Sequence, residues 1–549
     1  MKTRLMALMV CLILLTCAFG ASAEKEPLTV TYLSCWSGSS ANFPEDVTGN
    51  ASAQLIRDKF GIELTMSDNG GNQTEVGYLN MMFAADNVPD AVNAPYWGAE
   101  PGGEGAILIN GAIEGMVKDI SPYLDQFPNI KALYETEGML SASVMKNLVH
   151  NEKYPEGAIY FIPNDVDANA DEYRSVYGDT LYARADVLEA VGVKAEEVRT
   201  IEDLVNLLET IRDSGLTDWN GAAIIPLGTG HDGWRNANIY NWLRGNNISN
   251  WRRLEDGTVT YYLFTDYVEN RINLMRRLLS EGLMDVECLT QTDEVAQAKV
   301  LQGSYGVISV DANAVTNVFY YDNGIVNSHP EARWVPLGLT NLDGNNCVDV
   351  YQKGYSGGGV TFFRADIEEN KLLALLSLMD WMCSDEGAAF NSYGVEGVTF
   401  EYDEQHRPVL LSDVQAKIDE DSKARYNYGI KQFNAFNIYS KDNTRWPRSR
   451  EEMTAKEAAY QDMCDFFRPR AEVSGMSVEE LLSGWEGYDE LNDNLATLDV
   501  GTMIQRAYYF ETDEEVAKMI DDLRAKAIGF GIEDAMKYIQ ENLTDDYVF

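Results

Sequence analysis

The stretch from Gly157 to Ile211 constrains the fold more than any other part of this chain of 549 residues. Ile159 to Pro163 reads as a short strand, and a second strand, Leu181 to Asp186, follows after a polar loop. Two helices come next. The first ends at Gly192, a residue type that accepts the left-handed conformation common at helix C-termini. The second opens on the capping-box pattern Thr200-Ile201-Glu202-Asp203 and carries Leu204, Leu207, Leu208 and Ile211 at helical spacing.

The same alternation of strands and helices continues on both sides of this stretch. Strands are expected at Leu28–Leu33, Ile62–Met66, Asp90–Ala94, Ala223–Leu227, Tyr305–Asp311 and Tyr355–Phe363, and helices at Ala53–Phe60, Tyr78–Ala85, Glu294–Ala298 and Leu372–Met382. Such alternation is typical of α/β proteins with mostly parallel sheets. The segment after about Glu451 is instead helical and acidic throughout.

The first residues have the pattern of a signal peptide. Lys2 and Arg4 precede an apolar run, and Ala21-Ser22-Ala23 is a small-residue cleavage pattern, so residues 1–23 are expected to be removed. A lipid anchor on Cys17 is the alternative, although Thr16 stands where such anchors need a small residue. No later segment has the roughly 18 uninterrupted apolar residues of a membrane span. The protein is therefore expected outside the cytoplasm.

The charge and the cysteine content of the chain limit the kinds of ligand and partner that it can bind. The chain has 43 basic and 87 acidic residues, so a nucleic-acid partner is excluded, because phosphate binding needs clustered Lys and Arg. After Cys11 and Cys17 leave with the signal peptide, an odd number of cysteines remains without the spacing of a zinc site. We expect Cys383 to be a buried small apolar residue.

Several short passages resemble those of the bacterial extracellular solute-binding protein family 1, the substrate-binding proteins of ABC importers, and in particular its long carbohydrate-type subgroup. Met82 to Asp90 is similar to a recurrent FAAGDLPDI passage, and Glu294 to Asp311 to a helix and strand written F..GK.AM. Ser384 to Gly387 and Tyr393 to Val398 resemble the SEEG and YGxEG passages. Their order along the chain carries the resemblance, and the C-terminal segment fits it least.

The resemblance implies an α/β, two-lobe, periplasmic-binding-protein-like fold of type II. Each lobe would be a mostly parallel sheet flanked by helices, and hinge crossings at Gly157–Ile211 and Tyr355–Phe363 would join the lobes. Residues 24–162 with about 357–440 would form one lobe, and 163–356 with about 441–549 the other. A monomer would capture a sugar or oligosaccharide in the interlobe cleft by hinge closure and deliver it to the membrane subunits of an ABC importer. The resemblance implies no catalysis.

Sugar binding needs apolar ring faces for C–H groups and polar side chains for hydroxyls. Aromatic residues beside expected strand ends and polar residues near them are the candidates, although large aromatics also pack protein cores. The expected ligand-binding residues are Trp36, Tyr96, Trp97, Asp165, Asp167, Trp234, Arg235, Asp311, Tyr355 and Tyr393.

Two other functions stay open. Gly354-Tyr355-Ser356-Gly357-Gly358 matches the GxSxG pattern of hydrolases, so an exported polysaccharide-acting hydrolase is one. The pattern requires a helix after the serine, and Gly359 to Phe363 reads as a strand. A peptide-binding protein of the same fold is the other.

No cofactor is expected. Long members of the family carry a calcium loop after the second hinge helix, but Asp213 to Gly221 keeps only scattered oxygen ligands, and we expect a plain turn there.

Overall fold

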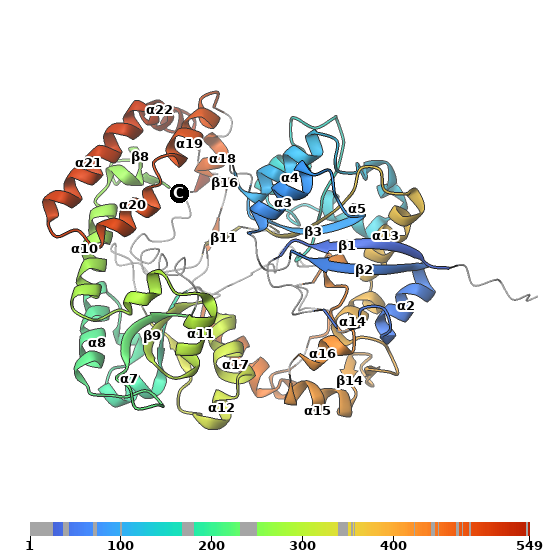
Figure 1. Cartoon of the computed structure of the whole chain (residues 1–549), viewed down its shortest axis with the longest axis horizontal. Coiled ribbons are helices and arrows are strands. Elements are labelled where there is room, and N and C mark those ends of the chain that lie inside the picture. Colours follow the sequence, from blue (N-terminus) through green and yellow to red (C-terminus); the bar gives the residue numbers. More distant parts are fainter. Residues whose placement is uncertain are drawn as a thin grey trace, which may run out of the picture. The chain divides into compact units, whose positions relative to one another are not determined.

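The chain forms two compact units in a computed structural model (Figure 1). The first unit comprises Met1–Leu140, Val144–Ala168 and Gly357–Arg445, and the second comprises Ser141–Ser143, Asn169–Ser356 and Trp446–Phe549. The structure describes residues 26–36, 43–44, 46–69, 74–98, 102–166, 180–230, 250–338, 350–352, 355, 357–421, 423–440, 445–447, 449–467, 472–474, 476–482, 485–544 and 547–548. The expected signal peptide lies outside them.

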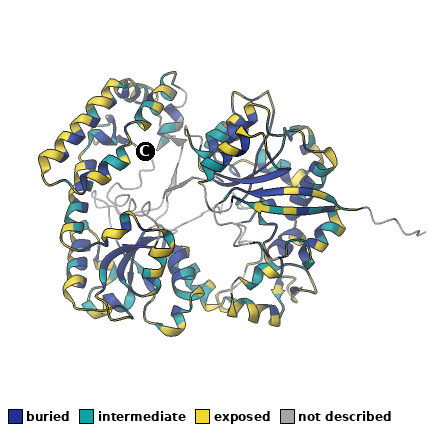
Figure 2. Cartoon of the chain, in the orientation of Figure 1, coloured by how far each residue is buried: buried dark blue, intermediate teal, exposed yellow. Residues whose placement is uncertain are grey.

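A five-stranded sheet forms the centre of the first unit, in the order β2-β1-β3-β12-β4. Its central strand β3 is buried at all six positions, as Figure 2 shows in dark blue. Asn93 is a polar residue within this otherwise largely apolar strand. The strands are β1 (Leu28–Ser34), β2 (Ile62–Asp68), β3 (Ala91–Tyr96), β4 (Ile162–Pro163) and β12 (Gly358–Phe363). The main helices are α2 (Ala51–Phe60), α3 (Glu75–Ala84), α4 (Glu104–Ile113), α5 (Pro128–Glu135), α13 (Glu369–Met382), α14 (Asp385–Tyr393), α15 (Ser412–Glu420) and α16 (Ala424–Asn427), with a hairpin of β13 (Phe400–Tyr402) and β14 (Pro408–Leu410).

The second unit is built on a four-stranded sheet in the order β10-β5-β9-β6. A separate hairpin pairs β7 with β8. The strands are β5 (Thr180–Arg184), β6 (Ile225–Thr229), β7 (Trp251–Arg253), β8 (Val259–Tyr261), β9 (Tyr305–Val310) and β10 (Trp334–Pro336), and short pairs join β11 (Val350–Gln352) to β15 (Glu472–Ser474) and β16 (Met476–Ser477) to β17 (Tyr547–Val548). The helices include α7 (Ala185–Val191), α8 (Ile201–Asp213), α10 (Tyr267–Ser280), α11 (Asp293–Leu301), α12 (Ile325–Ser328) and α17 (Ala455–Phe467).

The expectation of mostly parallel sheets needs correction. In the first unit β1 runs parallel to β2 and β3, but β12 is antiparallel to both β3 and β4. In the four-stranded sheet of the second unit β6 runs parallel to β9, but β5 is antiparallel to both β9 and β10. The strands that follow a passage of the chain between units, β5 and β12, are the ones that reverse direction. Their direction depends on where the chain enters the sheet, which local sequence does not encode.

The helix boundaries of the Gly157–Ile211 stretch are confirmed. Gly192 ends α7 with φ 72°, in the left-handed region. Thr200 accepts a hydrogen bond from the Asp203 backbone N–H, and the Asp203 side chain accepts one from the Thr200 N–H, which completes the capping box. The apolar face of α8 is buried. The first expected strand is shorter than predicted, since only Ile162–Pro163 pairs.

The C-terminal helices belong to the core of the second unit. These helices are α18 (Val478–Leu482), α19 (Tyr488–Ala496), α20 (Val500–Ala507), α21 (Asp513–Gly529) and α22 (Ile532–Asn542). Ile520 of α21 and Ile539 of α22 lie in one buried cluster with Leu208 of α8 and Met275 of α10. Arg524 donates from Nε to the Leu263 carbonyl at 2.8 Å. The segment that fits the family resemblance least is therefore structural.

Candidate functional site

A buried asparagine organises the edge of the first unit's sheet where β1 and β3 end. Asn93 lies in β3 with 4% of its surface exposed. Its Nδ2 donates to Asn164 Oδ1 at 2.9 Å and to the Val360 carbonyl at 3.2 Å, and its Oδ1 accepts from Trp36 Nε1 at 2.8 Å. A buried amide left without partners would cost about 1–3 kcal/mol. The network therefore fixes the orientation of Trp36.

Two tryptophans stand at this edge. Trp36 follows β1 and Trp97 follows β3, and the carboxyl ends of parallel neighbouring strands meet at one edge of a sheet. Their ring centroids are 5.9 Å apart, with the ring planes at 87°. Trp97 is 57% exposed, although exposing so large an apolar ring to water is unfavourable. An indole face held on a rigid base is suited to stacking against a ligand.

A polar cluster around Asp165 lies after strand β4 of the same sheet. Asp165 follows Asn164 and adopts φ 69°, a strained backbone conformation for a residue with a side chain. Its Oδ1 accepts a hydrogen bond from the Ser440 hydroxyl at 2.5 Å. Lys431 also has a positive φ, 62°, held by a hydrogen bond from its backbone N–H to the Asn391 carbonyl at 2.9 Å. Desolvation by the surrounding protein and the positive charge of Arg425 lower the pKa of the Lys431 ammonium. The negative charge of Asp165 acts in the opposite direction.

A glycine permits the close approach of β12 to Asn164. The Asn164 backbone N–H donates to the Gly359 carbonyl at 2.9 Å. A Cβ at Gly359 would lie 2.3 Å from Asn164 Oδ1, so the asparagine could not hold its place beside Asn93 if position 359 carried a side chain. The glycine-rich passage that resembles a nucleophile elbow thus runs into a strand, β12, and not into a helix. Ser356 and Gly354 lie outside the described residues.

Burial disfavours the thiolate form of Cys35, the residue next to Trp36. Burial raises the pKa of Cys35 to about 12, and the negative charge of Glu75 acts in the same direction. A protonated buried thiol is neither a nucleophile nor a metal ligand. In the described part of the chain, no three His, Cys, Asp or Glu side chains gather as a metal site would require. This edge thus presents an exposed indole face on a hydrogen-bonded base, and the Asp165 carboxylate and the Ser440 hydroxyl follow strand β4 of the same sheet.

The structure brings together only some of the residues expected from the sequence. Trp36 and Trp97 meet at the sheet edge, and Asp165 follows Asn164, which bonds to Asn93. Tyr96 and Tyr355 are 1% and 0% exposed, so their rings offer no surface to a ligand, and we leave them out of the site. Tyr96 points away because successive side chains of a strand alternate between faces.

The remaining expected residues fall elsewhere. Asp311 follows β9 in the second unit and accepts a hydrogen bond from the Ala314 N–H at 2.8 Å, as a helix cap does. Tyr393 is the last residue of α14 and lies against Phe400 with ring centroids 6.0 Å apart. Asp167, Trp234 and Arg235 lie outside the described residues.

Sequence reasoning missed Asn93, Asn164, Lys431 and Ser440. Asn93 carried a signal, because a lone amide inside an apolar strand must find hydrogen-bond partners when it is buried. Asn164 directly precedes the predicted Asp165. Lys431 and Ser440 lie in an irregular segment far along the chain, and only the folded structure brings them to Asp165.

The stretch aligned with the family's calcium loop forms a turn, as expected. Asp218 Oδ1 accepts from the backbone N–H groups of Asn220 and Ala222, both at 2.9 Å. Its Oδ2 accepts from the Ser304 hydroxyl at 3.2 Å. The carboxylate of Asp218 thus closes the turn itself.

None of the described helices is long and apolar enough to cross a membrane. No protein-family model matches the chain, and no curated protein matches it.

Solved structures match it over nearly their whole length. An alginate-binding protein, AlgQ2, crystallised without calcium ion, is 17% identical, with a TM-score of 0.65 over 95% of this chain and 99% of the other. An extracellular solute-binding protein from Bifidobacterium longum subsp. infantis is 16% identical, with a TM-score of 0.60 over 95% and 98%. FusA, the substrate-binding protein of a Streptococcus pneumoniae ABC transporter, in complex with kestose, is 15% identical, with a TM-score of 0.57 over 93% and 98%.

The chain has the two-lobe solute-binding-protein fold. In open α/β sheets, ligands bind outside the carboxyl ends of the strands. The tryptophan pair occupies such an edge, so the fold and the site geometry lead to the same part of the first unit.

Proposed function

We propose that the protein is an extracytoplasmic solute-binding protein of an ABC importer, which captures a sugar or oligosaccharide without altering it. The observation that carries the proposal is Trp97, 57% exposed and seated against Trp36, whose indole N–H is locked by buried Asn93. An exposed, rigid aromatic face costs little conformational entropy when a sugar ring stacks on it. Asp165 and Lys431 supply polar groups for hydroxyls. The similar structures are binding proteins: FusA is in complex with kestose, and AlgQ2 is an alginate-binding protein.

The proposed mechanism, hinge closure around the ligand, follows from the division of the chain into two units. In this proposal the two units correspond to the two lobes expected from the sequence, residues 24–162 with about 357–440 and residues 163–356 with about 441–549. The units themselves divide after Ala168, before Gly357 and after Arg445, and Ser141–Ser143 belongs to the second. Ligand contacts from both lobes favour the closed state, and the ligand shifts the equilibrium only by its preference for that state. The importer's membrane subunits then recognise the closed form of a monomer. A signal peptide at 1–23 would export the protein, and an anchor on Cys17 is the alternative to free release.

Replacement of Trp97 tests the site. We expect Trp97→Ala to weaken saccharide binding by about tenfold or more, because truncation of a central aromatic contact typically costs at least 1.4 kcal/mol. Tyr509→Ala is the matched control, since Tyr509 is an aromatic residue of the second unit, 63% exposed, with no role in the site. Calorimetric titration against mono- and oligosaccharides measures both. Equal affinity of the two variants would contradict the site.

Scattering and product assays test the function itself. Saturating saccharide should raise the melting temperature and make the molecule more compact in solution. Identical scattering profiles with and without ligand, and no saccharide that raises the melting temperature, would overturn the proposal. The hydrolase alternative predicts shortened saccharides after long incubation and their loss in Ser356→Ala. Peptides that bind where saccharides do not would favour the peptide alternative.

A further inference from the structure

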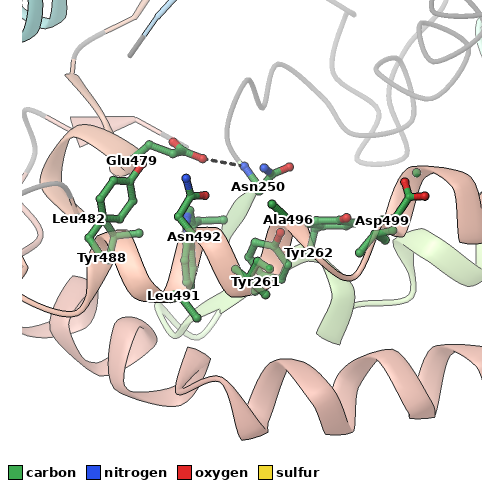
Figure 3. A pocket seen from close by; sticks show the side chains of 14 residues that line it. Asn250, Tyr261, Tyr262, Glu479, Leu482, Tyr488, Leu491, Asn492, Ala496 and Asp499 are labelled. Carbon is green, nitrogen blue, oxygen red and sulfur yellow. Dashed lines mark hydrogen bonds between the residues drawn. The ribbon is translucent and has the colours of Figure 1, made fainter. Parts of the chain in front are cut away.

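The second unit contains a pocket that the proposed function does not use. The pocket encloses about 310 Å³ between the β7–β8 hairpin and the C-terminal helices α18, α19 and α20 (Figure 3). This volume is at the lower end of the range of about 300–1,000 Å³ found for small-molecule sites. All the described residues that line it belong to the second unit.

The base of the pocket is rigid and aromatic. Trp251 and Tyr261, from the two strands of the hairpin, are 3% and 7% exposed, and their ring centroids are 5.1 Å apart. The hairpin is tied to α22 by a hydrogen bond from the Val259 N–H to Gln540 Oε1 at 2.8 Å. These contacts hold the aromatic base in place without a ligand, so ligand binding would cost little conformational entropy of the protein.

Polar groups surround this apolar base. The Asn250 backbone N–H donates to Glu479 Oε1 at 2.9 Å, which joins the hairpin to α18. Figure 3 shows the carboxamides of Asn250 and Asn492 on the same side of α19, with Tyr261 and Tyr262 beneath them. A carboxamide both donates and accepts hydrogen bonds, as a sugar hydroxyl does. The rings of half-buried Tyr262 and Tyr488 suit the apolar C–H face of a pyranose, and the two carboxamides suit its hydroxyls.

The charges at the pocket select against anions. Glu479 and Asp499 line it, and among its described lining residues there is no Lys, Arg or His. Asp499 begins α20 with φ 45°, a conformation that costs free energy and is held by the surrounding structure. Two carboxylates facing a site repel a negatively charged ligand, since like charges at short range are costly.

We propose that this pocket is a second saccharide subsite, which takes one uncharged sugar unit through half-buried Tyr262 and Tyr488 and the Asn250 and Asn492 carboxamides. The class of ligand rests on the proposed function, whereas the position of the subsite in the C-terminal helical layer does not. The subsite gives the C-terminal helices a binding role in addition to their structural one.

Asn492→Leu tests the subsite, because leucine has a similar volume and cannot bond to hydroxyls. Asn494→Leu, two residues along the same helix and outside the pocket lining, is the matched control. Glucose, maltotriose and kestose are titrated by calorimetry into both full-length variants, whose folding is checked by melting temperature. We expect at least one of these sugars to bind Asn492→Leu about tenfold more weakly than Asn494→Leu.

The combined outcomes separate the two proposals. Weak binding in Trp97→Ala with unchanged binding in Asn492→Leu overturns the subsite and leaves the proposed function standing. The reverse pattern supports the subsite and overturns the tryptophan site. Absence of binding by any of the saccharides overturns both proposals. Trigalacturonate, an anionic sugar, should bind less well than maltotriose and should gain affinity in Asp499→Asn; equal affinity in wild type and variant would overturn the selection for uncharged sugars.

Discussion

At the scale of single residues, one buried amide connects stability with binding. Asn93 holds Trp36 on one side and Asn164 on the other, and it is 4% exposed. Trp97 in turn rests against Trp36. The proposed binding surface therefore depends on Asn93, which is itself buried.

Asn93→Ala should lower both stability and affinity. We expect a loss of about 1–3 kcal/mol in the free energy of unfolding, because Asn164 Oδ1 and the Trp36 indole N–H lose their partner. Saccharide binding should weaken while Trp97 is still present. Urea denaturation and calorimetric titration measure the two effects, with Asn110→Ala on the exposed face of α4 as the control. Unchanged affinity would show that Trp36 needs no support from the sheet.

Gly192 offers a second test at this scale. Its φ is 72° and a Cβ would meet nothing within 4 Å, so Gly192→Ala introduces backbone strain without a steric clash. The cost should be about 1 kcal/mol. Gly529→Ala is the control, because Gly529 is helical, has no positive φ and also has open space around it. That variant should be as stable as the natural protein or gain a few tenths of a kcal/mol. Equal destabilisation of both variants would contradict the explanation.

At the scale of elements, Asp90 ties β1, β3 and α13 together. Its Oδ2 accepts from the Thr31 N–H at 2.9 Å and lies 3.2 Å from the Lys371 ammonium. Burial works to raise the pKa of this carboxyl, but the bonds from Thr31 and Lys371 outweigh burial and hold the pKa below its ordinary value. A network of this kind joins three elements through one side chain.

The pH dependence of Asp90→Asn follows from the sign of that shift. A carboxyl with a lower pKa in the folded state stabilises the protein fully above its unfolded pKa of about 3.9 and loses this effect as the pH falls through the folded value. Asp90→Asn should be about 2 kcal/mol less stable than wild type at pH 7. The difference should shrink between about pH 5 and pH 2. A constant difference in urea denaturation across this range would contradict the ion pair.

At the scale of the whole molecule, the C-terminal helices complete the core of the second unit. Val516, Ile520, Leu523 and Ile539 fill the core of the second unit together with residues of α8 and α10. Arg276 Nη1 also lies 2.5 Å from Asp513 Oδ1. The last segment of the chain therefore completes a core that is formed by helices much earlier in the sequence.

Removal of residues 511–549 should unfold the second unit selectively. The deletion exposes a buried apolar cluster, and the loss of several core side chains of about 1.5–3 kcal/mol each exceeds what a domain tolerates. Hydrogen exchange should become fast in α8 and α10 and stay slow in β1 and β3, which are the internal control. Unchanged protection in α8 would show that the second unit folds without its last helices.

The sequence by itself determined what depends on near neighbours. The cap at Thr200, the stop at Gly192, the buried face of α8 and the aromatic residues at the ends of β1 and β3 all follow from local spacing. Tertiary structure decided what depends on distant partners. β12 runs antiparallel to β3, Asn93 finds Asn164 and Val360, and Ser440 reaches Asp165 across 275 positions. Strand direction and buried hydrogen bonds are determined when remote segments pack together. The local pattern of residues along the sequence carries no information about that packing.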